Sequence, residues 1–60
     1  MTDHVAEAVL VYLRRLQHGA TVLEIAEALH LDRGDVRRAI RVLYCAHLVT
    51  GIGGPYWRAV

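Results

Sequence analysis

The chain has 60 residues, a formal net charge of +1 and one cysteine, and 55% of its residues are hydrophobic. This length allows a single domain over residues 1–60, which buries only about 60% of the surface that its unfolded chain exposes. One cysteine excludes an internal disulfide and a paired-cysteine metal motif.

The scarcity of cysteine favours a reducing, cytoplasmic location. The apolar stretch over residues 5–13 is interrupted by Glu7 and is too short to cross a bilayer, so we expect no membrane association. The high apolar content leaves hydrophobic surface outside so small a core, and self-association is the usual reason for such surface. We therefore expect a homodimer.

Charge is distributed unevenly along the chain. Residues 1–30 carry four acidic side chains against two arginines, whereas residues 31–60 carry two acidic side chains against five arginines. Every basic residue is arginine, the side chain suited to planar, bidentate contacts with phosphate or guanine. The second half of the chain is therefore expected to meet an anion.

The first expected helix covers residues 3–17. Thr2 or Asp3 can cap its start, and His18-Gly19 can stop it. An apolar stripe at helical spacing is formed by Val5, Val9, Leu13 and Leu16, with Leu10 beside it, and the apolar surface is widened by Ala8, Val11 and Tyr12. Such width indicates either a central, well-buried helix or a dimer interface.

The second expected helix covers residues 22–29 and has the clearest start signal of the chain. Thr21 followed by Glu24 matches a capping box, in which each side chain bonds the backbone amide of the other residue. Ile25, Ala26 and Leu29 are expected to face inward.

The third expected helix covers residues 33–46 and begins after Asp32, a preferred N-cap residue. Its apolar arc consists of Val36, Ala39, Ile40 and Leu43. The opposite side consists of Gly34, Arg37, Arg38, Arg41 and Cys45. The helix thus has one apolar face and one arginine face.

The last segment, residues 48–60, is expected to be a β-hairpin. Two extended runs, 48–50 and 56–60, flank a Gly-rich loop, and Ala20-Thr21 can add a short third strand. Alternation places Trp57 and Ala59 on one face of the last run and Tyr56, Arg58 and Val60 on the other.

Taken together, the two helices of Thr21 to Leu43 and the hairpin entered at Leu48-Val49 resemble a winged helix-turn-helix domain, and the resemblance covers nearly the whole chain. It implies a mainly α fold: three helices plus a C-terminal wing of two or three strands. The pattern is similar to that of small prokaryotic and phage regulators. Winged helices also serve as protein-interaction modules.

The segment Pro55-Tyr56-Trp57-Arg58 gives a narrower resemblance, to the winged domains that bind left-handed Z-DNA. Those domains use a wing proline and tryptophan against the DNA backbone, and they carry an asparagine and a tyrosine on the recognition helix. Here Arg37 and Arg41 stand at those two places, and the wing is shorter. Z-DNA-type backbone binding is therefore a minor alternative.

Six residues are candidate DNA contacts: Arg33, Gly34, Arg37, Arg38, Arg41 and Arg58. The three arginines at 37, 38 and 41 either reach guanine edges and phosphates or form a solvated basic face. Arg33 and Gly34 would lie near the phosphate backbone at a helix start, and Arg58 would act from the wing.

Other chemistry has little support. Tyr56 and Trp57 are expected to pack rather than stack on bases. The four histidines lie on different elements without the i, i+4 spacing of a helical metal pair, so no metal is expected. With no nucleophile motif or phosphate loop, we expect no catalytic residue, cofactor or small-molecule substrate.

The sequence thus predicts a sequence-specific binder of double-stranded DNA, a small transcriptional regulator with its third helix in the major groove. A homodimer through the first helix or the C-terminal strand would read half-sites about 34 Å apart. The alternative is a winged domain that binds another protein and does not act on DNA directly. It would use either its excess apolar surface or its arginine face, the latter against an acidic partner.

Overall fold

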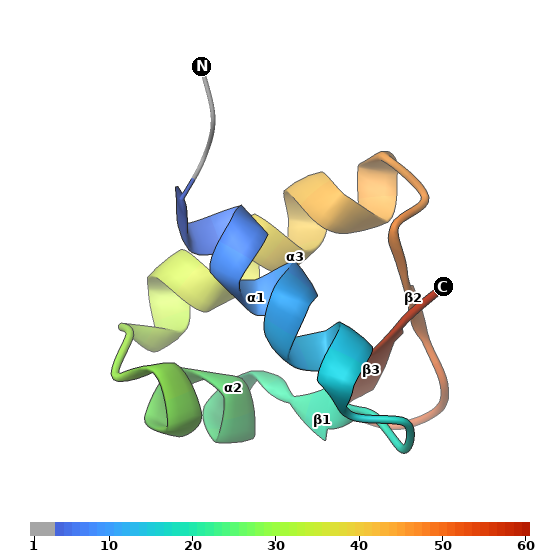
Figure 1. Ribbon diagram of the computed structural model, residues 1–60, viewed down its shortest axis with the longest axis horizontal. Coiled ribbons are helices and arrows are strands. Elements are labelled where there is room, and N and C mark those ends of the chain that lie inside the picture. The colour runs from blue at the N-terminus through green and yellow to red at the C-terminus, as the bar shows by residue number, and fades with distance from the viewer. Residues whose placement is uncertain (1–3) are drawn as a thin grey trace.

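The computed structural model describes residues 4–60, which form three helices and a three-stranded sheet (Figure 1). The elements in chain order are α1 (His4–Arg15), β1 (Ala20–Thr21), α2 (Val22–Leu29), α3 (Arg33–Cys45), β2 (Val49–Gly51) and β3 (Tyr56–Ala59). The expected cap at Thr2 or Asp3 lies outside the described residues. The mainly α architecture with a small wing confirms the predicted fold class.

The sheet is antiparallel, with the strand order β1-β3-β2. β3 pairs with β1 through Ala20 opposite Trp57, and with β2 through Val49 opposite Ala59. The short third strand expected at Ala20-Thr21 is therefore present. β3 is therefore the central strand, paired with β2 along Trp57–Ala59 and with β1 along Tyr56 and Trp57.

The two predicted N-caps that fall within the described residues both form. Thr21 Oγ1 accepts a hydrogen bond from the Glu24 amide at 3.1 Å, and Glu24 Oε1 accepts one from the Thr21 amide at 3.0 Å, which is the capping box. Asp32 caps α3 by accepting from the Gly34 amide at 2.9 Å. The turn between α2 and α3 is closed by His30, which adopts a left-handed conformation at φ 55°.

The hydrophobic core lies where the three helices meet one face of the sheet. Its largest fully buried side chains are Leu13, Ile25, Val9, Val36 and Val49. The apolar arc expected on the third helix is buried as predicted. Ala6 is also buried, although the predicted stripe on the first helix did not include it.

Two predicted helix ends are corrected. α1 ends at Arg15 rather than residue 17, and α3 ends at Cys45 rather than residue 46. After α1 the chain turns through Gly19, whose φ is +81° and whose missing side chain leaves room for the Trp57 carbonyl oxygen; an added Cβ would lie 2.7 Å from that oxygen. The turn toward β1 thus depends on a glycine.

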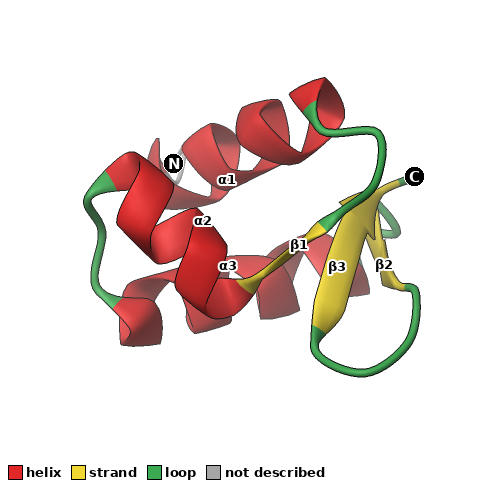
Figure 2. Cartoon of the chain, turned by 90° about the horizontal axis from the view of Figure 1, so that it is seen from below, coloured by secondary structure: helices red, strands yellow, loops and turns green. Residues whose placement is uncertain are grey.

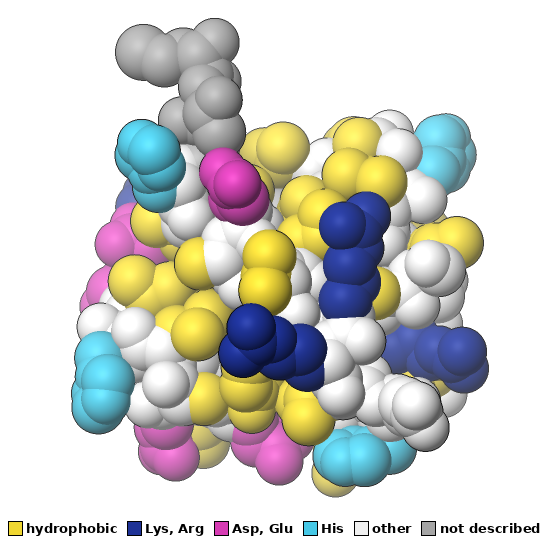
Figure 3. Space-filling view, in the orientation of Figure 1, with side chains coloured by type: hydrophobic (Ala, Val, Ile, Leu, Met, Phe, Trp, Pro, Cys, Tyr) yellow, Lys and Arg dark blue, Asp and Glu magenta, His cyan; other side chains and the backbone are white. Residues whose placement is uncertain are grey.

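Figure 2 shows α1 on one side of the domain, and α3 with the wing loop on the other. Figure 3 looks onto the α1 side, where hydrophobic side chains are exposed and basic side chains lie between them across the middle of the face. None of the helices described is both long and apolar enough to cross a membrane.

Candidate nucleic-acid interface

The outer face of α3 carries the arginines that the sequence singled out. Val36, Ala39, Ile40 and Leu43 are buried, which fixes the rotation of the helix and turns the other side to solvent. Arg33, Arg37, Arg38 and Arg41 are all exposed. The structure therefore presents the α3 arginines together on one accessible surface.

These arginines are not equivalent, because one of them has a partner. The Arg38 guanidinium donates to the Asp35 carboxylate three residues earlier on the same helix, and the Arg38 side chain remains 78% exposed. Among residues 4–60, Arg37 and Arg41 form no ion pair with a carboxylate. Their charge is therefore not compensated within the part of the chain that the structure describes.

A hollow of about 310 Å³ lies beside this surface, between α3 and the wing. Its walls are lined by Val22, Arg37, Ile40, Arg41, Tyr44 and Trp57. The Tyr44 and Trp57 rings meet edge to face, with centroids 5.8 Å apart and planes at 77°. The hollow thus combines two unpaired guanidinium groups with an aromatic pair.

Tyr44 is the residue of this site that sequence reasoning missed. It follows Arg41 by three residues and Arg37 by seven, which places all three on one face of α3. This helical spacing is the sequence signal from which Tyr44 could have been predicted as part of the site. Tyr44 is 54% exposed, whereas Trp57 is half-buried and packs against the core as expected. The packing expected of Tyr56 is wrong, because the outward alternation of β3 leaves its side chain exposed.

The start of α3 is already engaged by its own cap. The Gly34 amide donates to Asp32, and a Cβ on Gly34 would lie 2.9 Å from Asp32 Oδ2. Glycine at this position thus leaves room for the capping carboxylate. The Gly34 amide, which was expected to meet phosphate, is thus already hydrogen-bonded to the negatively charged Asp32 carboxylate.

Arg58 is separated from the α3 arginines. It is exposed on β3, where alternation turns it to the opposite face from Trp57, and it lines another hollow with Arg14 and Gln17. The wing loop at Gly53 and Gly54 is open, and both residues have positive φ. The structure thus brings Arg37, Arg38 and Arg41 together and leaves Arg58 apart.

No cluster of three or more histidine, cysteine, aspartate or glutamate side chains within residues 4–60 is placed to hold a metal ion. His30 and His47 instead occupy left-handed positions at the ends of α2 and α3, at φ 55° and 62°.

Comparison with known proteins adds a structural match only: no family model and no curated protein matches the sequence. Among solved structures, the chain is similar to one that describes the binding mode of cyprinid herpesvirus 3 ORF112-Zalpha to Z-DNA. The TM-score is 0.85 at 24% identity, over 100% of this chain and 98% of that one. This likeness and the element order together define a winged helix fold.

Proposed function

We propose that this domain binds double-stranded DNA through the outer face of α3 and the adjoining side of the wing. The observation that carries the proposal is the α3–wing hollow, where Arg37 and Arg41 lie uncompensated beside the Tyr44–Trp57 pair. Guanidinium groups of this kind bind phosphate oxygens, and the aromatic rings form a rigid wall beside them. Arg33 and Arg38 extend the positive surface along α3.

The contacts are directed mainly at the DNA backbone, and the favoured substrate is a duplex in the left-handed Z form. Two features support this reading. The fold likeness to the Z-DNA-bound ORF112-Zalpha structure extends over the whole chain. In addition, Trp57 of the wing lines one hollow with Arg37 and Arg41 of α3, so α3 and the wing present one surface to a ligand.

An alternating CG duplex tests this proposal. Adding the protein at moderate salt should invert the circular dichroism of the duplex as right-handed DNA converts to the left-handed form. Arg37→Ala and Arg41→Ala should each weaken the conversion, whereas Arg58→Ala, on the other face of β3, serves as the control. Unchanged dichroism at saturating protein, measured together with binding, would exclude the left-handed form.

The second candidate is sequence-specific reading of right-handed DNA by α3 in the major groove, as a small transcriptional regulator. It is favoured by three neighbouring arginines on one helix face, because arginine makes bidentate contacts with guanine. Selection from a random duplex pool separates the two candidates. A regulator enriches one defined site, whereas a backbone binder of Z-DNA enriches only sequences that convert readily to the left-handed form.

If the domain binds neither the right-handed nor the left-handed duplex, the remaining candidate function is binding to an acidic protein partner. In that case Arg37 and Arg41 would face carboxylates instead of phosphates. We propose a cytoplasmic location, where an exposed thiol such as that of Cys45 stays reduced.

A further inference from the structure

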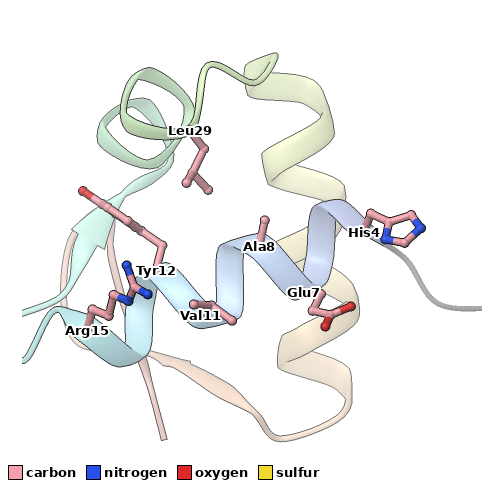
Figure 4. Close-up of a pocket in the computed structure, with 7 residues that line it drawn as sticks. All are labelled: His4, Glu7, Ala8, Val11, Tyr12, Arg15 and Leu29. Atoms are coloured by element: carbon pink, nitrogen blue, oxygen red, sulfur yellow. The ribbon is translucent and has the colours of Figure 1, made fainter.

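The side of the domain away from α3 carries a second hollow, of about 410 Å³, between α1 and α2. Its apolar walls are Ala8, Val11 and Tyr12 of α1 and Leu29 of α2, and Glu7 and Arg15 lie at its rim. Figure 4 shows Ala8 and Leu29 pointing toward one another across it, with Val11 and Glu7 on the outer edge of α1.

This surface is apolar, and no other part of the described chain packs over it. Val11 is 44% exposed, although it lies in the middle of a helix whose other side buries Val9 and Leu13. At about 100° per residue, Val11 points almost directly away from that buried side. Leu29 and Tyr12 extend the apolar surface from Val11 toward α2.

The charges on α1 indicate what covers it. Glu7 lies in the first turn, and Arg14 and Arg15 lie in the last turn. None of these three forms an ion pair within residues 4–60. A helix that is acidic at one end and basic at the other is complementary to a second copy of itself laid antiparallel, and repels a copy laid parallel.

We propose that the occupant is a second copy of this chain, whose α1 packs antiparallel on α1 across a two-fold axis near Val11. Apolar side chains from both copies then fill the middle of the contact, and the acidic end of each helix meets the basic end of the other. Twelve residues span about 18 Å of helix, so the contact is small and the association weak.

This arrangement differs from the dimer expected of a regulator. β3 is the central strand, so only its edge beside β1, at Arg58 and Ala59, is left for pairing with a second sheet. Pairing through α1 turns the two α3 faces away from each other, because α1 and α3 lie on opposite sides of the domain (Figure 2). If the proposed function holds, such a dimer joins two duplexes rather than reading two half-sites on one.

Sedimentation equilibrium without DNA tests the pairing itself. The mass should rise from the monomer value of 6.7 kDa toward twice that value as the concentration is raised toward about 1 mM. Val11→Glu, which places two carboxylates against each other near the axis, should weaken association about tenfold or more. The matched control is Glu27→Arg, a charge change on the exposed side of α2 that should leave the mass unchanged.

A charge exchange tests the antiparallel order. Glu7→Arg alone and Arg14→Glu/Arg15→Glu together should each weaken self-association, because like charges then meet at both ends. An equimolar mixture of the two variants should associate again, since each contact joins one arginine and one glutamate. Far-UV circular dichroism reports that each variant is folded, and recovery in the mixture cannot come from unfolded chains.

A wild-type mass of 6.7 kDa at every concentration, or a mixture that fails to associate, would overturn the proposal. Duplex bridging is then measured separately, by capture of a labelled duplex on an immobilised one. Val11→Glu should abolish capture while binding to a single duplex persists. Loss of both would indicate that DNA binding, not pairing, has failed.

Discussion

Replacing Asp35 by asparagine should strengthen DNA binding, because the Asp35 carboxylate holds the Arg38 guanidinium on the surface of α3. The substitution releases a cation and removes a negative charge from the binding face. Each additional phosphate contact steepens the dependence of log K on log salt by about 0.9. When salt rises from about 50 to about 200 mM, one additional contact therefore makes the loss of affinity about 3.5-fold larger.

Fluorescence titrations at several salt concentrations measure this effect. Asp35→Asn should steepen the slope by about one contact, and adding Arg38→Ala to that variant should remove the gain. In the wild-type background Arg38→Ala should change the slope less than Arg41→Ala, because only Arg38 has an internal partner. Equal slopes for wild type, Asp35→Asn and Arg41→Ala would refute the assignment of these arginines to phosphate.

Four further substitutions test the fold that supports the site. Gly19→Ala should destabilise the domain by more than about 1 kcal/mol in urea unfolding, because φ is +81° and the new Cβ would meet the Trp57 carbonyl oxygen. Gly53→Ala, also at positive φ but in open space, should cost less. Thr21→Ala removes a capping bond and should cost about 1 kcal/mol, with unchanged stability arguing against the capping box. Leu13→Ala opens a cavity in the core and should cost about 2–5 kcal/mol, enough to unfold much of so small a domain at 25 °C.

Local rules accounted for most of the fold. The capping box at Thr21, the cap at Asp32 and the apolar arc of the third helix are decided by neighbours in sequence, and all three are present in the structure. The third strand at Ala20 was also predicted. The end of α1 was not, because the chain leaves the helix early to reach the turn at Gly19.

The site was harder to predict because it joins elements distant in the chain. Nothing local to Tyr44 shows that Trp57 will meet it, since their contact requires the hairpin to fold back beside α3. The pairing of Asp35 with Arg38 depends on a choice of rotamers that the sequence leaves open. The separation of Arg58 from the α3 arginines could not be predicted without knowing which face of β3 turns toward α3.

Nuclear magnetic resonance mapping of an added duplex tests the central claim most directly. The chain has one tryptophan, so the Trp57 indole N–H gives a single assignable signal beside Arg37, Arg41 and Tyr44. We predict that the largest shifts fall on these four residues and that the signals of α1 stay in place at low protein concentration. Shifts centred on α1, or none at all at saturating duplex, would contradict a DNA-binding surface on α3.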